Sequence, residues 1–391
     1  MLSVYIHIPF CVRRCWYCDF ITYAGMQDWL PAYVSSAQQE IRWLAEAAPA
    51  EREAAQTVYF GGGTPSLLSV DQVEALLKAV RGNFGIAEGA EITIEANPGT
   101  LSLDYLRKLR TLGVNRLSLG VQSFADAELQ QLGRIHSRAE ALESLRWARQ
   151  AGFENLSIDL IFGLPGQSLA AWQQNLQTAI AIHPEHLSLY NLIVEEGTPL
   201  AAQIAKGQTP APDDDLAADM YEFTMDFMGA AGYEQYEISS WAAAAELESR
   251  HNKAYWKGTP YLGIGVAAAS YAEGMRTLNT TSIQGYIHSI SSQQTALPYP
   301  LSAANSERTP VDPFTQMQES MMLGLRLTRE GVSGADFKAR FGQEMADVFP
   351  KEIQRLIEKG LVEWVDFQDG PHLRLTRRGT MFGNQAFMEF V

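Results

Sequence analysis

The feature that most constrains the fold is a regular alternation of short β-branched runs and longer amphipathic runs over the first 240 residues. The short runs have the composition of strands, and the longer runs have the apolar spacing of helices. Such alternation is typical of βα units on a parallel sheet. The expected strands are 3–8, 57–60, 91–96, 115–121, 155–161 and 186–192. The expected helices are 30–47, 70–81, 102–112, 138–151, 169–182 and 213–231.

A weak internal repeat supports this interpretation. The segments 112–119, 151–158 and 231–238 each join the end of a helix, through a glycine, to the start of a strand. Glycine at that point can take the left-handed conformation that ends many helices. A series of such units closes, wholly or in part, into a barrel that binds ligands at the carboxyl ends of its strands. We therefore expect an α/β fold with a partial (β/α)6-type parallel barrel.

The rest of the chain has a different pattern. The stretch 241–312 is rich in Gly, Ser and Ala, and we expect an irregular connecting region there. From Pro313 onward, two helical patterns, a hairpin over 361–376 and a last short helix predict a small winged-helix-like domain over 313–391. The expected organisation is thus a core domain over 1–240, the connecting region, and the C-terminal domain.

Charge and hydropathy limit the partners of the chain. Its formal net charge of -15 argues against a polyanion as the main partner, because phosphate binding needs clustered Lys and Arg. Winged helices often bind DNA, but acidic and basic side chains nearly balance over 313–391, so we expect no nucleic-acid binding. The sequence has no apolar run of bilayer-spanning length and no signal peptide. We expect a soluble cytoplasmic protein without a transmembrane segment, and a peripheral association with a membrane stays open.

All three cysteines of the chain, Cys11, Cys15 and Cys18, lie within residues 11–18. Clustered cysteines in a reducing compartment indicate a metal site rather than disulfides or unrelated buried thiols. A structural zinc site takes four ligands, so a histidine would have to join these three. A [4Fe-4S] cluster held by three cysteines leaves one iron open for another ligand, whereas an electron-transfer ferredoxin normally supplies a fourth thiolate.

The spacing C-x-x-x-C-x-x-C after the strand "VYIHIPF" resembles the signature of radical S-adenosylmethionine proteins. The resemblance implies that the three cysteines hold a [4Fe-4S] cluster and that the amino and carboxylate groups of S-adenosylmethionine chelate the open iron. It also implies that reduction of the cluster cleaves the sulfonium. A low-potential cluster beside an electron-poor sulfonium suits radical chemistry inside a barrel.

Further motifs at the expected strand ends fit this ligand. The loop "FGGGTPS" (60–66) has glycines that let its backbone approach a ligand, although a tight βα turn explains it equally well. It lacks the lysine of a phosphate loop. Polar side chains at the other strand ends suit a zwitterion with ribose hydroxyls, and each alone also fits a capping or salt-bridging role. The cofactor-binding residues that the resemblance implies are Tyr5, Tyr17, Gly62, Gly63, Thr64, Glu95, Gln122, Arg134 and Asp159.

The motifs "YIHIPFC", "GGGTPS", "IEANP", "GVQSF", "GRIH", "DLIFGLPGQ" and "LRLTRRG" together resemble the oxygen-independent coproporphyrinogen III oxidase family over nearly the whole chain. Within that family the chain is more similar to the heme-chaperone branch than to the oxidases. The oxidase pattern continues to a fourth cysteine, and this chain has Phe20 at that place. The segment "HNKAYW" (251–256) resembles the H-N-x-x-Y signature of the chaperone branch.

The resemblance implies a heme chaperone that binds heme and delivers it to acceptor proteins. His251 is the candidate heme ligand, because neutral imidazole is a common protein ligand of heme iron. A histidine that hydrogen-bonds within its own loop is the alternative. No catalytic residue is assigned. The loop "GIGVAAAS" (263–270) departs from the family form G-P-G-A-H-S at Ala267 and Ala269, so we assign it no ligand contact.

Two other functions stay open. One is oxidative decarboxylation of porphyrinogen propionates, the reaction of the oxidases. The other is a regulatory module whose C-terminal domain binds a protein and whose cluster senses redox state.

Overall fold

The computed structural model describes residues 2–391, which form two compact units. The first unit contains the residues up to Ala217 together with Pro260–Thr309. The second unit contains Ala218–Thr259 and Pro310–Val391. Each unit therefore joins two stretches that are distant in the sequence. The three-segment division expected from the sequence stays a prediction.

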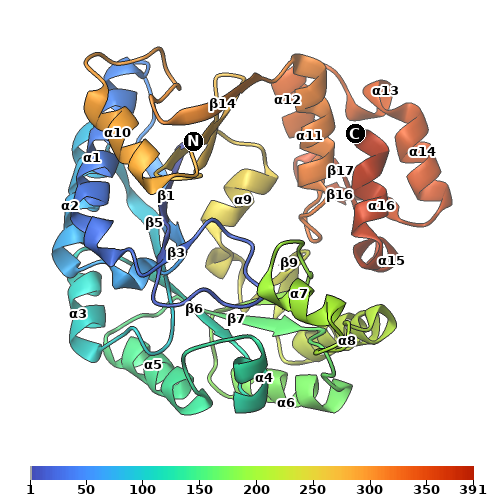
Figure 1. Cartoon of the computed structure of the whole chain (residues 1–391). Helices are drawn as coiled ribbons and strands as arrows, with labels where there is room; N and C mark the ends of the chain where they lie inside the picture. Colours follow the sequence, from blue (N-terminus) through green and yellow to red (C-terminus); the bar gives the residue numbers. More distant parts are fainter. Residues whose placement is uncertain (1) are drawn as a thin grey trace. The chain divides into compact units, whose positions relative to one another are not determined.

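The first unit is built on a parallel sheet with helices between successive strands (Figure 1). Its parallel strands, in spatial order, are β1 (Leu2–Ile8), β4 (Ala55–Gly62), β5 (Ile86–Ala96), β6 (Arg116–Gln122), β7 (Leu156–Phe162) and β8 (His186–Asn191). The principal helices are α1 (Leu30–Ala47), α2 (Val70–Asn83), α3 (Leu103–Thr111), α5 (Arg138–Gln150), α6 (Leu169–Ile180) and α8 (Asp214–Ala230), the last of which runs into the second unit. Short elements complete the α/β region: β2 (Phe10–Cys11), β3 (Tyr23–Ala24), α4 (Asp126–Gln131) and α7 (Pro199–Ala205).

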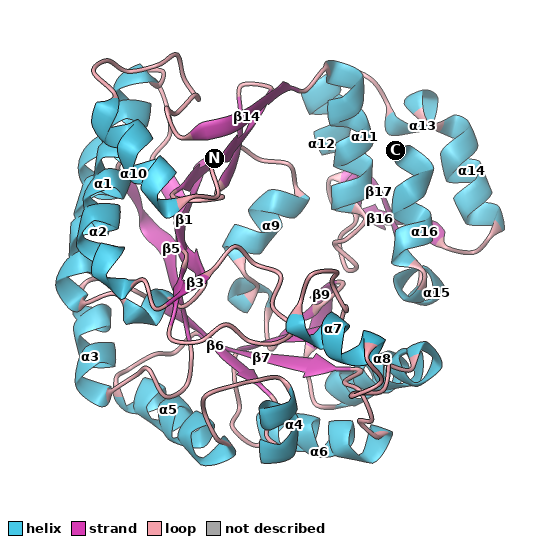
Figure 2. Ribbon diagram, viewed as in Figure 1, coloured by secondary structure: helices cyan, strands magenta, loops and turns pink. Residues whose placement is uncertain are grey.

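The predicted partial barrel is confirmed, and every expected strand and helix of this region has a counterpart. The sheet does not close on itself, because the edge of β1 that faces away from β4 pairs in parallel with β11 (Tyr261–Ile264). Figure 2 shows the helices α1, α2, α3 and α5 along one side of the strands.

The two faces of the parallel sheet differ in chemistry. On one face, the strand register aligns Val4 with Val58 and Ile158 with Leu187, and all four side chains are buried. Side chains alternate between the faces of a strand, so the neighbouring positions line the opposite face. There the same register aligns Tyr5 with Tyr59, Glu95 with Ser118, and Asp159 with Ser188. The polar face therefore carries three of the residues expected to bind the cofactor.

The stretch 241–312, expected to be irregular, has regular elements, and part of it extends the sheet. The strands β12 (Ala269–Ala272) and β13 (Met275–Asn279) continue antiparallel from β11, followed by α10 (Ile283–Ser292) and β14 (Asn305–Pro310). The Glu40 carboxylate on α1 is only 1% exposed and holds this extension in place. It accepts hydrogen bonds from the Gly265 amide (2.9 Å), the Tyr286 hydroxyl (2.7 Å) and the Ser302 hydroxyl (2.6 Å). The extension is fixed by these long-range contacts, which no local sequence pattern reveals.

Ala267 is strained, because its φ of 54° lies in the left-handed region that favours glycine. We expect Ala267→Gly to stabilise the protein by about 1 kcal/mol, since relief of this strain exceeds the extra chain entropy that glycine loses on folding. Denaturant unfolding of the full chain measures the effect. The neighbouring Ala268→Gly is the matched control, because Ala268 has no positive φ and should lose stability. Equal destabilisation by both substitutions would show that position 267 is unstrained.

The second unit begins at Ala218 within α8 and continues through the hairpin of β9 (Glu234–Glu237) and β10 (Ser240–Ala242) to α9 (Arg250–Trp256). Its C-terminal part has the antiparallel sheet order β15–β17–β16, formed by β15 (Val332–Ser333), β16 (Val362–Phe367) and β17 (Gly370–Leu375). The helices are α11 (Pro313–Gly324), α12 (Gly334–Phe341), α13 (Met345–Val348), α14 (Pro350–Glu358), α15 (Arg377–Met381) and α16 (Gly383–Phe387). The expected hairpin is present, and helices pack around it as in a winged helix.

The helices that precede this hairpin are more numerous than the two expected. The left-handed Gly342 ends α12, and Pro350 starts α14, so the second helical pattern is divided into shorter helices. Their apolar faces enclose a common core with Met321, Phe337, Leu356, Leu373 and Phe390 at or below 2% exposure. Within residues 2–391, no helix is long and apolar enough to cross a membrane.

Candidate functional site

The carboxyl ends of the parallel strands bring the predicted cofactor residues of the first unit together. The three cysteines follow β1, the glycine loop ends β4, Glu95 lies near the end of β5, and Asp159 lies on β7. Because parallel strands all end at the same edge of a sheet, residues far apart in the sequence meet there. His251 lies in the second unit and belongs to a different local structure.

Cys11 is buried in β2, and Cys15 and Cys18 are half-buried in the loop before β3, all three as free thiols. The Thr64 hydroxyl lies 3.5 Å from the Cys11 sulfur, and Arg134 Nη1 lies 3.4 Å from the Cys15 sulfur. Burial raises the pKa of Cys11 and Cys18 above the ordinary thiol value. A cationic iron centre would offset that cost, since it binds the thiolate form.

No three His, Cys, Asp or Glu side chains among residues 2–391 are arranged to hold one metal ion together. A [4Fe-4S] cluster needs a different arrangement of its cysteines, because each cysteine binds a separate iron atom. The three thiols of the Cys11–Cys18 segment could hold such a cluster.

The glycine loop at the end of β4 leaves no room for side chains. A Cβ atom at Gly62 would lie 2.5 Å from His7 Cε1, and one at Gly63 would lie 3.0 Å from the Cys11 sulfur. Gly62 also has a φ of 111°, which side-chain-bearing residues rarely adopt. The backbone of this loop thus lies directly against the cysteine segment, where a cluster ligand would be bound.

Two carboxylates lie half-buried on the polar face of the sheet. Glu95 accepts hydrogen bonds from the Tyr59 hydroxyl (2.7 Å) and the Gly62 amide (3.1 Å). Burial, opposed by the Tyr59 hydrogen bond, raises the pKa of Glu95 to about 7. Burial also raises the pKa of Asp159, whose carboxylate accepts from the Ser118 hydroxyl at 3.2 Å. The Arg116 charge lowers the pKa of both groups but does not outweigh the effect of burial, so a positively charged ligand would be stabilised beside them.

A chain of contacts that the sequence did not predict connects Cys11 with Cys15. Thr64 Oγ1 accepts from Asn97 Nδ2 at 3.1 Å, and Arg134 donates to Asn97 Oδ1. Arg134 also donates to the Gly120 carbonyl at 2.6 Å, which fixes its guanidinium. Asn97 follows Glu95 by two residues in "IEANP", just beyond the strand end. That position in the sequence could have identified Asn97 as a residue of the site.

The remaining predicted residues of the first unit line the same region. Gln122 ends β6 with a φ of 67°, a strained conformation for a residue with a side chain. The Tyr5 hydroxyl shares a hydrogen bond with His7 Nδ1 (3.0 Å), and His7 Nε2 lies 3.1 Å from the Ile21 carbonyl. Tyr17 packs on the apolar cluster around Leu132, and burial raises its pKa. His7 thus links the first strand to the cysteine loop, a role that the sequence did not predict.

The predicted heme ligand lies on the short helix α9, which the Ser249 hydroxyl caps through the Asn252 amide (3.3 Å). His251 is buried, and its Nε2 shares a 2.9 Å hydrogen bond with the Tyr255 hydroxyl one turn later. The two rings meet edge to face, with centroids 4.9 Å apart. The next residue, Trp256, stacks on the Arg326 guanidinium, which lies 4.4 Å from its ring.

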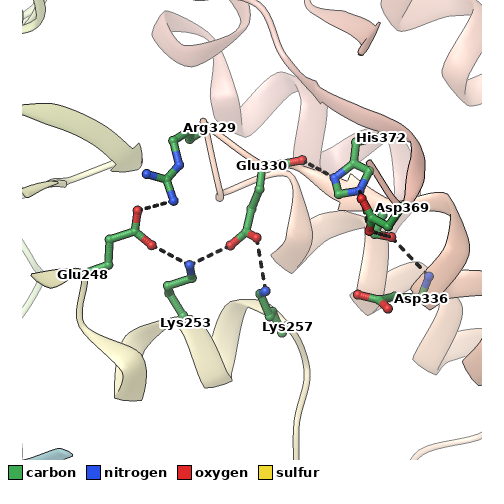
Figure 3. Close-up of polar contacts among 9 residues, drawn as sticks. Glu248, Lys253, Lys257, Arg329, Glu330, Asp336, Asp369 and His372 are labelled. Carbon is green, nitrogen blue, oxygen red and sulfur yellow. Dashed lines mark hydrogen bonds and ion pairs between the residues drawn. The ribbon is translucent and has the colours of Figure 1, made fainter. Parts of the chain in front are cut away.

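A series of ion pairs surrounds α9 (Figure 3). Glu248, just before the helix, pairs with Arg329 (2.6 Å) and with Lys253 (2.5 Å). Lys253 also pairs with Glu330 at 3.0 Å, and Glu330 reaches Lys257 at 3.2 Å. Burial alone would raise the pKa of Glu330, but Lys253 and Lys257 hold it below its ordinary value. These contacts fix the helix to the segment between α11 and β15.

Two protein families match the chain. Residues 5–179 match the Radical SAM superfamily, and residues 311–382 match the HemN C-terminal domain. The first match covers the cysteine segment and the strands that carry the polar site, and the second covers most of the C-terminal part of the second unit.

Curated relatives match over most or all of the chain. The heme chaperone HemW of Bacillus subtilis is 38% identical over 392 residues, covering 100% of this chain and 99% of the relative. HemW of Escherichia coli is 39% identical over 296 residues, covering 73% of this chain and 75% of the relative. Among solved structures, coproporphyrinogen III oxidase (HemN) from Escherichia coli, a radical SAM enzyme, matches with a TM-score of 0.82 and 26% identity. That match covers 100% of this chain and 89% of the oxidase.

Proposed function

The chain belongs to the family of the heme chaperone HemW, and we propose that it binds heme and delivers it to acceptor proteins. We propose further that its first unit carries a [4Fe-4S] cluster on Cys11, Cys15 and Cys18 and binds S-adenosylmethionine beside it. The observation that carries the proposal is the full-length match to HemW, which spans both the cysteine site and the helix with His251.

The residues of the first unit fit these cofactors. When bound, the cluster would supply an open iron for the cofactor and a route for single electrons. Thr64 and Arg134 lie against two of the thiols, so they would orient the thiolates and balance their charge. The half-buried carboxylates of Glu95 and Asp159 would attract the cationic groups of S-adenosylmethionine.

The oxidase alternative has one structural observation in its favour, the likeness to HemN over the whole chain. The identity to that oxidase is 26%, lower than the 38% identity to HemW of Bacillus subtilis. Phe20 also stands where the oxidase pattern has its fourth cysteine, and its side chain is 68% exposed. These differences favour the chaperone.

A heme titration tests the proposal. Reconstituted protein, with its cluster intact, should bind one heme per chain and shift the Soret band away from that of free heme. Serum albumin and heme alone serve as references for unspecific binding. Absence of a saturable Soret change at any heme concentration would refute heme binding.

The half-buried Glu95 carboxylate should favour cofactor binding at the expense of stability. Its pKa of about 7 in the folded chain exceeds the ordinary value of 4.5, so ionisation opposes folding as the pH rises from about 4.5 to about 7. Glu95→Gln removes this cost, which is about 3 kcal/mol at most above pH 7. We expect the variant to melt at a higher temperature than the wild type at pH 8, but at nearly the same temperature at pH 4.5.

The same variant should bind S-adenosylmethionine more weakly at pH 8, because the negative charge facing the ligand is lost. Calorimetry measures that affinity, and iron content should stay unchanged. Glu88→Gln is the matched control, since Glu88 lies on the same strand but is exposed. Unchanged cofactor affinity in Glu95→Gln would exclude Glu95 from the cofactor site.

A further inference from the structure

The nitrogen of His251 that heme iron would bind is engaged in a hydrogen bond within α9. Axial histidines usually bind through Nε2, because Nδ1 lies close to the backbone. The His251 Nε2 lies 2.9 Å from the Tyr255 hydroxyl, and the imidazole is 1% exposed. Tyr255 itself is half-buried. The half-buried Tyr255 therefore lies over Nε2 of the buried His251.

We propose that Tyr255 is a cover for His251, and that its hydroxyl must turn away from Nε2 before heme can be bound. This inference rests on the proposed function, since it takes His251 as the heme ligand. It assigns Tyr255 a positioning role: in the absence of heme, the hydroxyl satisfies the buried imidazole, and on heme binding the iron replaces it.

The ion pairs around α9 indicate which part moves. Glu248 at the start of the helix, Lys253 in its middle and Lys257 at its end are all held by partners in the same unit (Figure 3). Glu248 is almost completely buried, with 2% of its side chain exposed, so breaking its pairs leaves a charge without compensation. The stack of Arg326 on Trp256 adds a further contact. Rotation of one half-buried side chain breaks fewer contacts than displacement of the helix.

The free energy needed to turn the Tyr255 hydroxyl away from His251 sets how much the heme affinity changes. Among the contacts that the rotation breaks is the hydrogen bond of the Tyr255 hydroxyl to His251 Nε2, and a neutral hydrogen bond contributes about 0.5–1.5 kcal/mol net. That range corresponds to a factor of about two to ten in affinity. The closed state lowers the apparent heme affinity by the same factor, because only the open fraction binds.

Tyr255→Phe tests the cover, because it keeps the ring and removes only the hydroxyl. We expect it to bind heme two- to tenfold more tightly than the wild type and to associate faster in stopped-flow measurements at the Soret wavelength. Tyr221→Phe is the matched control: it also removes a hydroxyl hydrogen bond within the second unit, to the Ile238 carbonyl (2.7 Å), and should leave heme affinity unchanged. Thermal melting of both variants checks that each is folded.

The double variant His251→Ala/Tyr255→Phe separates the cover from the ligand. If the cover acts through His251, the gain from Tyr255→Phe disappears in the His251→Ala background. If folded Tyr255→Phe binds heme no more tightly than the wild type while His251→Ala still binds it poorly, Tyr255 is not a cover, although His251 remains the heme ligand. Normal heme binding in His251→Ala would show that His251 is not the heme ligand. An equal gain in both backgrounds would show that Tyr255 acts elsewhere.

Discussion

Replacement of any one of Cys11, Cys15 and Cys18 by Ala is expected to abolish the [4Fe-4S] cluster. Each change removes one of the only three thiols in the chain, so no other cysteine can take its place. An iron corner without its thiolate is open to solvent, and the cluster loses a ligand that fixes it to the protein. Iron and sulfide analysis after anaerobic reconstitution, with the broad visible absorption, measures the loss.

The control for these variants is Asp19→Ala, an exposed residue in the same loop, which should bind iron as the wild type does. Thermal melting should confirm that each cysteine variant is folded. A cysteine variant that keeps the iron content and spectrum of the wild type would remove that residue from the ligand set.

His251→Ala should lower heme affinity by more than tenfold, which corresponds to about 1.4 kcal/mol, because a coordinate bond to iron is lost. The Soret band should also shift, since its position depends on the axial ligand. Titration of the reconstituted protein with heme measures both quantities. Cys15→Ala should still bind heme, because α9 and the cysteine segment belong to different units.

His288→Ala is the matched control, since it removes an exposed imidazole from α10. It should leave the heme titration unchanged. If His251→Ala retains the wild-type affinity and spectrum, the histidine is structural and another group holds the heme.

Local sequence patterns are sufficient to predict the parallel sheet. Each βα unit contains its own strand, helix and turn signals, so its elements can be predicted one at a time. Because parallel strands end at one edge of the sheet, the sequence also predicts that Glu95 and Asp159 lie near the cysteines. These predictions depend on spacing and on the general geometry of parallel sheets.

The parts that could not be predicted depend on long-range contacts. The extension of the sheet through β11–β13 is held by Glu40, whose partners lie more than 200 residues away in the sequence. The contacts among Thr64, Asn97 and Arg134 join loops that follow different strands. The hydrogen bond of Tyr255 to His251 is local, at a spacing of one helical turn, and the helical pattern could have revealed it.

Under the proposed function, the chain carries heme and does not decarboxylate a porphyrinogen. Anaerobic incubation of the reconstituted protein with coproporphyrinogen III, S-adenosylmethionine and a reductant tests it most directly, with a parallel sample that receives heme. We expect no protoporphyrinogen in the first sample and a stable complex of one heme per chain in the second. Repeated turnover of coproporphyrinogen III to protoporphyrinogen, without saturable heme binding, would contradict it.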